Sequence, residues 1–574
     1  MKQKITTEAI NELFGIKESF ELPEVLLKKL LNKQEKDELC RAFMKFEVDM
    51  RNDCLRDYFQ MNNANRSNLK QDYTPDCLCK LISALAPKTD RVIDICSGTG
   101  ALTIGVGDDV EYQCEELSSM SIPVLLFNLA LRGINATVLQ KDVLLNKIEK
   151  IYKISKNGDF SDIEIIEDYV ETKANVVISN PPYSLKWQPK SDPRFDGYEL
   201  APRNASDYAF VLDGLSRLTE IGQAFYILPS GVLYRGNAEY KIRKQLVKNN
   251  LIDAVIALPE NLFLNTSIPV NILVFNKAKK NDDVLFISAN KMFKKNGKQN
   301  VMTDEHIEQI KEVYLSRKTV DKFSNVVKQS KIRDNDYCLS VSRYIDTFER
   351  EEIPPLSEIT KDIINANLQV NKATNDLLKM LKEICGDENY NVLKDEFIKY
   401  FKQRDVVGET MIEYLELQNL EKRVDYIVTH VKKERRPIFD LATFERVKKG
   451  KIYDSGTVYI QLSATDGKVK YLAENKELET KFGVFIPKNG YIGSRYLYYM
   501  LDFEMEEFLH KFQNGININP DIFKYLQVTY YTEYKYQKEL AMLLDGIQLR
   551  YDKELKEKEE WEYFKKYHLD KMFP

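Results

Sequence analysis

The segment Asn180-Pro181-Pro182-Tyr183 has the residue types needed to hold the amino group of a nucleobase. It follows an apolar, β-branched run at 176–179, and α/β sheets bind ligands where their strands end. The prolines restrict the backbone, so the side chain of Asn180 and the carbonyl of Pro181 can face one point. These two acceptors suit an exocyclic amine, and accepting both N–H bonds favours a tetrahedral nitrogen whose lone pair can attack a methyl group.

Tyr183 adds a flat face on which a base taken out of a duplex would stack. Such stacking is worth about 1–3 kcal/mol per base and needs no particular sequence. The alternative interpretation of the segment is a rigid turn with an incidental tyrosine.

A second candidate site lies upstream, in RVIDICSGTG (91–100). An apolar run containing Asp94 leads into the turn Gly98-Thr99-Gly100, which opens a helical stretch. Glycines allow a ligand to approach the backbone closely, because a Cβ would collide with it. Alone, the pattern is equally compatible with cofactor binding and with a simple tight turn.

Glu116 supports the cofactor interpretation because it lies 18 residues beyond Gly98. Rossmann-like sites place an acid at about this spacing, at the end of the second strand, where it holds ribose hydroxyls. Glu116 is preferred to its neighbour Glu115 because Leu117 is then expected to face the core. The alternative is an exposed acid at a strand end.

The elements expected to position these residues alternate between 71 and about 280. Short β-branched runs separated by helical stretches predict βαβ units and a mostly parallel sheet. The runs are RVIDIC, NATVLQ, NVVISN, QAFYILP, DAVIALP and VNILVFN. Residues 1–70, with apolar residues at three- and four-residue spacing, predict a helical N-terminal region. The predicted fold is therefore α/β with a Rossmann-like sheet over 71–346.

The remainder of the chain divides by composition. Residues 347–435 are charged, leucine-spaced and helical, which indicates a helical spacer, a coiled-coil arm or an amphipathic surface helix. Turn residues and aromatics over 436–533 indicate a small mixed α/β domain. Residues 534–574 are again helical and heavily charged, and are expected to form a C-terminal helix.

Composition narrows the class of protein. The 574 residues are 43% hydrophobic, with a net charge of −4, which is typical of a multidomain soluble protein. No apolar run approaches about 18 residues and no signal peptide is evident, so a cytoplasmic protein without membrane contact is expected. Cys77 and Cys79 are wrongly spaced for zinc, and the four histidines lie apart, so no metal site is expected. No Walker-type phosphate loop and no nuclease cluster is present.

Together, the two motifs resemble those of the amino-group DNA methyltransferases that use S-adenosylmethionine, in the order of the gamma class. More closely, residues 70–345 resemble the modification subunit of type I restriction–modification systems. The matching stretches are QDYTP (71–75), both motifs, GQAFYILPSGVLYRG (222–236), residues 242–277 and NDYCLSVSRYID (335–346).

The resemblance implies a role for each matching residue. For S-adenosylmethionine, it places Tyr73, Thr74 and Pro75 at the methionine end, Asp94, Gly98, Thr99 and Gly100 beside it, Glu116 at the ribose and Asp142 at the adenine amine. For catalysis, it assigns the loop to Asn180, Pro181, Pro182 and Tyr183, with Asn180 also beside the cofactor, and it places Phe263 on the flipped base opposite Tyr183. One departure is Ser97, which intervenes between Cys96 and Gly98.

The target atom follows from the same comparison. Methylation of C5 of cytosine requires a nucleophilic cysteine, preceded in that family by proline, and the chain contains no Pro-Cys pair. Adenine N6 and cytosine N4 remain, and Asn with Tyr more closely resembles the adenine enzymes. The expected reaction is direct transfer to N6 of a flipped adenine in double-stranded DNA, without a metal.

Residues 444–469 and 493–501 resemble the target-recognition domain of type I specificity subunits, as does the leucine-rich helix after Gln537. The resemblance implies about half of a specificity subunit, fused to the enzyme. Over 430–451 there are eight basic and three acidic residues, a net charge of +5 that suits phosphate contacts or, alternatively, a solvated hinge. The candidates for base readout are Gln461, Arg495, Gln513, Asn514, Asn517 and Asn519.

The expected partners include double-stranded DNA and a second copy of the chain, paired through the helices at about 370–435 and 534–574. An alternative is a modification subunit that is active only with a separate specificity subunit, with or without a restriction subunit. A further alternative is methylation of RNA or of a protein glutamine by the same loop.

Overall fold

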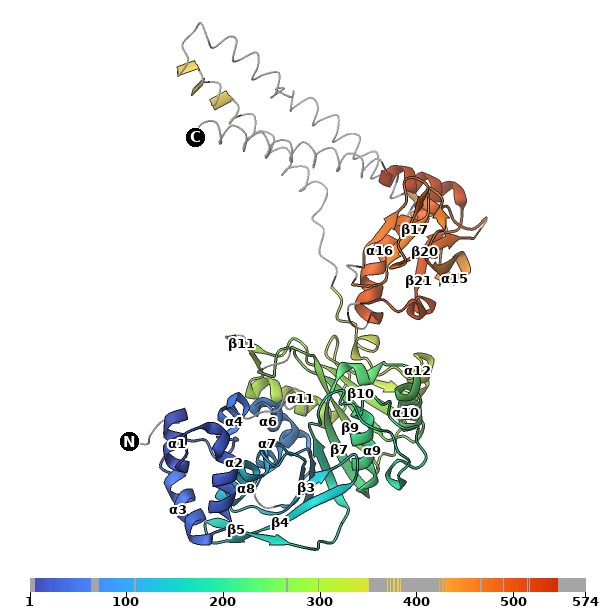
Figure 1. The fold of residues 1–574 in the computed structure, drawn as a ribbon. Helices are drawn as coiled ribbons and strands as arrows, with labels where there is room; N and C mark the ends of the chain where they lie inside the picture. Colours follow the sequence, from blue (N-terminus) through green and yellow to red (C-terminus); the bar gives the residue numbers. More distant parts are fainter. Residues whose placement is uncertain are drawn as a thin grey trace. The chain divides into compact units, whose positions relative to one another are not determined.

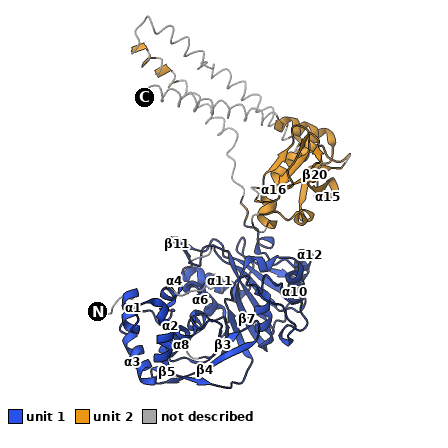
Figure 2. Ribbon diagram, viewed as in Figure 1, with its two compact units in different colours: residues 1–347 blue, residues 348–574 orange. Residues whose placement is uncertain are grey.

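The computed structural model describes residues 6–62, 72–107, 110–264, 267–297 and 299–349, scattered positions from 369 to 430, and 431–545 except 465, 466, 489, 514 and 516. The chain divides into two compact units, residues 1–347 and 348–574 (Figure 2). Each unit is described by itself.

The first unit begins with helices that pack beside the main sheet (Figure 1). They are α1 (Thr7–Phe14), α2 (Leu22–Leu30), α3 (Lys33–Phe43) and α4 (Arg56–Asn62). Thr6 caps α1 by accepting a hydrogen bond from the amide of Ala9, and Gly15, at φ 71°, ends the helix in the left-handed conformation. Phe14 and Phe43 both pack edge-on against Phe127, so the N-terminal helices share the core of the unit.

An 11-stranded sheet forms the centre of the first unit, in the order β13-β10-β8-β9-β7-β6-β1-β2-β3-β4-β5. Its strands are β1 (Arg91–Ile95), β2 (Glu111–Glu116), β3 (Asn135–Asp142), β4 (Lys147–Asn157), β5 (Phe160–Ile166), β6 (Ala174–Ser179), β7 (Leu218–Pro229), β8 (Ile252–Ala257), β9 (Val270–Asn276), β10 (Asp283–Ser288) and β13 (Ser324–Lys328). The five neighbours β3, β2, β1, β6 and β7 run parallel. Strand β9 inserts antiparallel between β7 and β8, and antiparallel strands extend both edges.

Helices cover both faces of this sheet. They are α6 (Asp76–Leu85), α7 (Ala101–Val106), α8 (Ile122–Leu131), α9 (Asp207–Ser216), α10 (Asn237–Lys248), α11 (Asp304–Ser316) and α12 (Gln329–Asp334), and a hairpin of β11 (Lys294–Asn296) and β12 (Gln299–Val301) adds to them. Alternate residues of the central strands enter different cores, since Val176 and Ile178 lie in one apolar cluster and Val177 lies in the other. Short 3-10 turns occur at Ser19–Glu21, Pro193–Phe195, Ser230–Leu233 and Val341–Arg343.

The second unit contains a small antiparallel sheet in the order β15-β20-β17-β18, against which helix α16 packs. Two ribbons, β14 with β21 and β16 with β19, complete it. Its elements are β14 (Lys433–Pro437), α15 (Ile438–Leu441), β15 (Ala442–Arg446), β16 (Ile452–Tyr453), β17 (Val458–Gln461), β18 (Val469–Tyr471), β19 (Lys476–Glu477), β20 (Phe482–Pro487), α16 (Ser494–Phe512), a 3-10 turn at Pro520–Tyr525 and β21 (Gln527–Tyr531).

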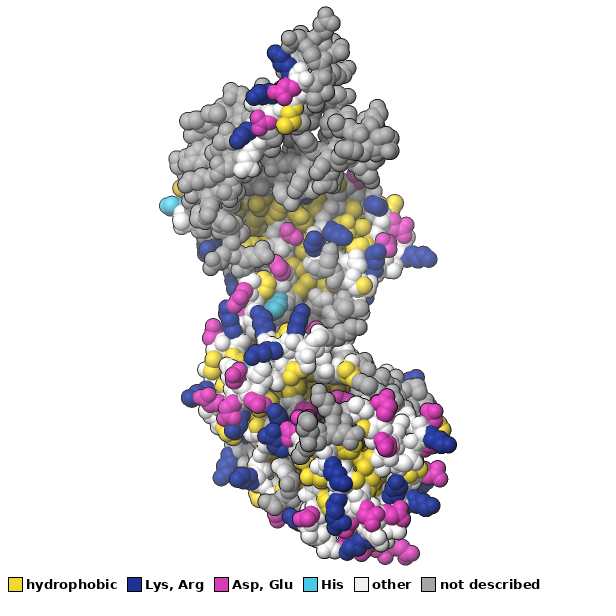
Figure 3. All heavy atoms as spheres, turned by 90° about the vertical axis from the view of Figure 1, so that its left-hand side faces the viewer, with side chains coloured by type: hydrophobic (Ala, Val, Ile, Leu, Met, Phe, Trp, Pro, Cys, Tyr) yellow, Lys and Arg dark blue, Asp and Glu magenta, His cyan; other side chains and the backbone are white. Residues whose placement is uncertain are grey.

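The predicted α/β fold class is confirmed, with its helical N-terminal region, parallel central strands and small mixed α/β unit. Most of the predicted spacer, Asn514 and the part of the predicted C-terminal helix beyond 545 lie outside the described residues, whereas 534–545 are helical. Among the described helices none is long and apolar enough to cross a membrane. On the face of the first unit seen in Figure 3, basic and acidic side chains are interspersed.

Candidate active site

The two sequence motifs meet because β1 lies between β2 and β6. All three strands are parallel, with Ile95 beside both Glu115 and Ser179. The loop after β1 therefore emerges next to the loop after β6, at the carboxyl edge of the sheet, where α/β proteins bind ligands.

A cavity of about 320 Å³ lies between these loops. The predicted residues that line it are Tyr73, Thr74, Gly98, Thr99, Glu116, Asp142, Asn180, Pro181, Pro182 and Tyr183. The predicted residues outside its lining are Pro75, Asp94, Gly100 and Phe263.

Asn180 is held by hydrogen bonds on both sides of its amide. Its Nδ2 donates to Thr74 Oγ1 at 3.0 Å and to the carbonyl of Asp72 at 3.4 Å. Its Oδ1 accepts from the hydroxyl of Tyr183 at 2.8 Å. The partners of Nδ2 fix which way the amide faces, so the acceptor oxygen is directed away from Thr74 and toward Tyr183.

Tyr183 and Phe263 lie together, but they are not parallel plates. Their ring centroids are 6.1 Å apart and the rings are inclined at 88°. A base stacked between two rings needs them parallel, so the predicted sandwich requires one ring to turn when the base arrives. Burial raises the pKa of Tyr183 well above its ordinary value, so its hydroxyl stays protonated and able to donate.

The glycine turn requires its glycines. Gly98 has φ +58°, and a Cβ there would lie 3.1 Å from the ring of Tyr73; Gly100 has φ +90°, and a Cβ would lie 2.8 Å from Leu125. The amide of Gly98 donates to Glu116 Oε2 at 2.9 Å. The turn and the acid after β2 are thus one hydrogen-bonded unit, with Gly100 serving the packing of α8 rather than lining the cavity.

Glu116 is a buried carboxylate whose oxygens each accept one backbone bond, from Gly98 and from the amide of Ser118 at 2.7 Å. Burial raises its pKa, and the amide bonds oppose that rise. The expectation that Leu117 faces the core is wrong, because this side chain is 40% exposed and lines the cavity. Strand β2 ends at Glu116, so side-chain alternation no longer governs the next residue.

Asp94 lies beneath the glycine turn and is fully buried. Its Oδ2 accepts from Thr103 Oγ1 at 2.6 Å, which ties β1 to α7, whereas its Oδ1 has no hydrogen-bond partner among the described residues. Asp94 therefore supports the turn from below.

Asp94→Asn is expected to change how stability depends on pH. Burial raises the pKa of Asp94 from 3.8 to about 7, against the opposing bond from Thr103. An acid with a raised folded-state pKa stabilises fully below its unfolded pKa and loses that contribution as pH rises through the folded value. The wild type should therefore lose stability relative to the variant between pH 4 and 7, by about 3 kcal/mol. Urea unfolding at several pH values measures this, and a constant difference across the range would contradict it.

Residues 73–75 bring the N-terminal region to the cavity. Tyr73 bonds to Ser121 Oγ at 3.0 Å, and Pro75 precedes the first residue of α6. The backbone carbonyl of Thr74 accepts from Arg56 at 3.2 Å, and Thr99 Oγ1 donates to Asp53 at 2.5 Å. The segment 53–56 thus braces both the glycine turn and the segment that orients Asn180.

Sequence reasoning missed Asp53 and Arg56, since nothing in their local pattern distinguishes them from ordinary helix-capping and surface charges. It also missed Phe210 and Trp187, which line the cavity from α9 and from the segment after the catalytic loop. An aromatic within the apolar helix 207–216 was the available signal for Phe210.

The candidates for base readout in the second unit are engaged in local structure. Gln461 donates to the carbonyls of Ser463 and Ala464, Gln513 donates to the carbonyl of Gly515, Asn517 accepts from Ala464, Asn519 caps the turn at Pro520 and Arg495 pairs with Asp545. Each of these five residues therefore makes at least one local hydrogen bond or ion pair, and its role in base readout stays a prediction.

A glycine turn after β1, an acid at the end of β2 and an Asn-Pro-Pro-Tyr loop after β6, on this sheet, define a Rossmann-like methyltransferase. Residues 53–353, just over half of the chain, match the model of the N-6 DNA methylase family. The chain belongs to that family, and its enzyme class is that of a DNA methyltransferase.

Two curated relatives are methylase subunits of type I restriction enzymes. The MpnII subunit of Mycoplasma pneumoniae is 32% identical over 385 residues, which cover 62% of this chain and 68% of the relative. The MjaVIII subunit of Methanocaldococcus jannaschii is 32% identical over 355 residues, 57% of each chain. A crystal structure of a type I methyltransferase subunit from Streptococcus thermophilus is 29% identical, covers 59% of this chain and 77% of its own, and has a TM-score of 0.46. The predicted resemblance to type I modification subunits is confirmed for the first unit.

Proposed function

We propose that the chain transfers a methyl group from S-adenosylmethionine to N6 of an adenine flipped out of double-stranded DNA. The observation that supports this best is the position of the Asn180 amide, held by Thr74 at the wall of the cavity that Gly98 and Glu116 also line. The amide acceptor and the cofactor-type residues therefore share one enclosed space.

The residues around the cavity fit the cofactor chemically. Two carboxylates, Glu116 and Asp142, suit ribose hydroxyls and an adenine amine, and the apolar side chains of Leu117 and Phe210 suit the faces of the purine. When bound, S-adenosylmethionine supplies a methyl group on a positively charged sulfur. Asn180 and the carbonyl of Pro181 would accept the two N6 hydrogens, and Tyr183 would hold the base by stacking.

The first test is methyl transfer by the purified chain alone, from labelled S-adenosylmethionine to unmethylated genomic DNA, with sequencing that locates the modified base. Label at adenine N6 in one recurring sequence supports a self-sufficient enzyme whose second unit reads DNA. Label at cytosine, or transfer only to RNA or protein, would overturn the proposed substrate.

A second candidate role is a modification subunit that requires a separate specificity subunit, which the likeness to methylase subunits of type I restriction enzymes favours. Binding of the cofactor without methyl transfer by the chain alone would support it. Removing residues 436–574 distinguishes the two roles, because loss of a reader abolishes site choice while cofactor binding persists.

Whether two copies of the chain pair is decided by light scattering on a cognate duplex, and a monomer there would exclude the pairing.

The basic loop between β15 and β16 is expected to contact DNA phosphates. Lys448 and Lys449 are exposed there. Lys448 lies 3.9 Å from Glu445, and Lys451 pairs with the same carboxylate at 2.5 Å. Replacing Lys448 and Lys449 by Gln should make the slope of the logarithm of the binding constant against the logarithm of salt concentration shallower by up to about 0.9 per lost contact. Affinity should fall roughly tenfold, equally for all sequences. Fluorescence anisotropy over a salt series measures both.

The matched control replaces by Gln two exposed lysines of the N-terminal region, Lys28 in α2 and Lys45 in the turn after α3. This double variant has the same net charge as the first. An equal loss of DNA affinity in both double variants would show a general charge effect and contradict a specific contact by the loop.

A further inference from the structure

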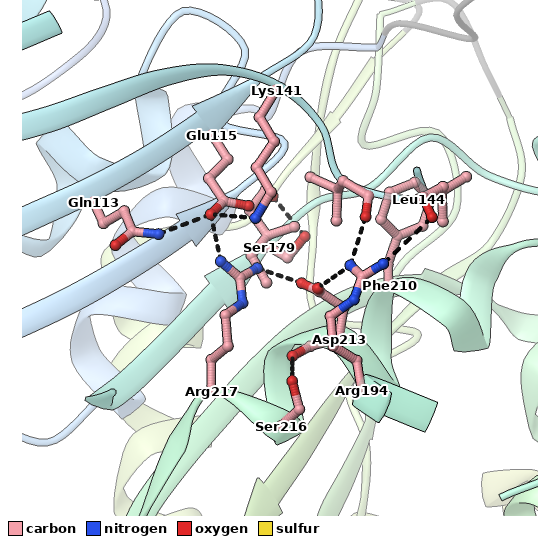
Figure 4. A network of polar contacts seen from close by, with 12 residues as sticks. Gln113, Glu115, Lys141, Leu144, Ser179, Arg194, Phe210, Asp213, Ser216 and Arg217 are labelled. Atoms are coloured by element: carbon pink, nitrogen blue, oxygen red, sulfur yellow. Dashed lines mark hydrogen bonds and ion pairs between the residues drawn. The ribbon is translucent and has the colours of Figure 1, made fainter. Parts of the chain in front are cut away.

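A charge-balanced network of buried and half-buried side chains connects helix α9 with the wall of the cavity (Figure 4). Its members are the acids Glu115, Asp192 and Asp213 and the bases Lys141, Arg194 and Arg217. Glu115, Lys141 and Asp213 are almost completely buried. The proposed chemistry uses none of these six side chains.

The contacts run from strand to helix without a break. Glu115 Oε1 accepts from Gln113 at 2.8 Å, from Lys141 at 3.2 Å and from Arg217. Arg217 also pairs with Asp213, whose other oxygen accepts from Arg194 at 2.6 Å. Burial pushes the pKa of Glu115 upward, but Arg217 and Lys141 outweigh it and hold the pKa at about 2, so the carboxylate is ionised.

The last cation of the network holds the backbone of the cavity wall. Arg194 Nη1 donates to the carbonyl of Val143 at 2.7 Å, and Asp192 fixes the other side of the guanidinium through bonds of 2.9 and 2.8 Å. Val143 and Leu144 line the cavity directly after Asp142. Asp142 itself accepts from the amide of Leu145 at 2.9 Å, so the orientation of this acid depends on the same short segment.

The opposite end of α9 holds the catalytic loop. Asp207 Oδ1 accepts from the amide of Ser184 at 3.0 Å, directly after Tyr183, and Ser184 has the left-handed φ of 49°. Between the two ends, Phe210 lines the cavity. Asp207, Phe210 and Asp213 are spaced by three residues, which places them on one face of the helix.

We propose that α9 sets the spacing between methyl donor and acceptor, with Asp213 and Arg194 as positioning residues for the cofactor and Asp207 as a positioning residue for the catalytic loop. This inference rests on the proposed function. A purely structural network is the competing explanation, and buried ion networks contribute little net stability. The positioning roles predict that changes at Arg194 weaken cofactor binding and that changes at Asp207 slow methyl transfer. A purely structural network predicts no such separation.

The test compares variants at the two ends of α9. Arg194→Gln should weaken binding of S-adenosylhomocysteine, measured by calorimetry, about tenfold, because Val143 loses its donor. Arg194→Lys should be intermediate, since one ammonium cannot replace the planar fork. Both should lower single-turnover methylation at saturating cofactor by less than about threefold.

Asp207→Ala should do the reverse: affinity stays within about twofold and the single-turnover rate falls about tenfold. Asp207→Asn keeps an acceptor for Ser184 and should restore the rate.

Arg317→Gln is the matched control, because Arg317 also bridges two acids, Asp253 at 2.9 Å and Asp283 at 2.7 Å, away from the cavity lining. Thermal unfolding of all variants measures the structural contribution. Arg317→Gln should leave both affinity and rate unchanged. If the Arg194 and Asp207 variants lost affinity and rate in equal proportion, the positioning roles would be overturned. If the wild type bound no S-adenosylhomocysteine, the proposed function would fail instead.

Discussion

Asn180→Ala is expected to lower methyl transfer at saturating cofactor by at least about 10³-fold, the largest effect of any single change in this chain. The variant loses the side-chain acceptor for N6, and loss of one such preorganised group at a reacting centre typically costs two to three orders of magnitude. It also leaves the hydroxyls of Tyr183 and Thr74 without their partner. Single-turnover kinetics with labelled cofactor and a cognate duplex measure the effect.

The informative control is Asn180→Asp, which keeps an acceptor for N6 but gives up the amide donor to Thr74. We expect it to retain more activity than alanine, with affinity for S-adenosylhomocysteine within about tenfold of the wild type in both variants. Activity of the alanine variant within tenfold of the wild type would show that Asn180 does not hold the reacting amine.

Glu116→Ala is expected to have the largest effect on cofactor binding, a loss of at least about 100-fold in affinity for S-adenosylhomocysteine. Charged acceptors for ribose hydroxyls are worth about 1.5–3 kcal/mol each. In addition, the amides of Gly98 and Ser118 lose the carboxylate that fixes the glycine turn. Titration calorimetry measures the affinity directly, without requiring turnover.

Glu116→Gln separates the two contributions. It keeps the side-chain size and one acceptor for a backbone amide, so the turn should persist while ribose binding weakens. We expect an intermediate affinity and a melting temperature near that of the wild type. If the alanine variant bound the cofactor within threefold of the wild type, another residue would have to hold the ribose.

The sequence predicts those parts of the site whose geometry depends on residues that are close together in the chain. β-branched runs bounded by turns mark six central strands, and two loops at their carboxyl ends must meet because β1 and β6 are parallel neighbours. The hairpin of β4 and β5 is not among the predicted strands, although its two-residue loop Gly158-Asp159 is a common hairpin signal.

Contacts between distant segments are what local patterns cannot supply. Asp53 meets Thr99 across 46 residues, and Arg217 meets Glu115 across 102. Neither pairing has a periodic or compositional signature, because each depends on how the whole sheet is assembled. For the same reason no local pattern predicts the ion network beside α9, although Glu115 is adjacent to the predicted cofactor residue Glu116.

The hydroxyl of Tyr183 already donates a hydrogen bond to the side-chain oxygen of Asn180. When the target base binds, its amino group replaces that hydroxyl as the donor, so the oxygen exchanges one hydrogen bond for another. Because an amino group can replace the Tyr183 hydroxyl, the side-chain oxygen of Asn180 keeps a hydrogen-bond donor throughout binding. Thymine or guanine would present a carbonyl oxygen at this point and could not take over the bond. Leaving a buried acceptor unpaired costs about 1–3 kcal/mol, so the resting loop carries a discrimination of roughly 5- to 150-fold against the wrong base before any chemistry begins.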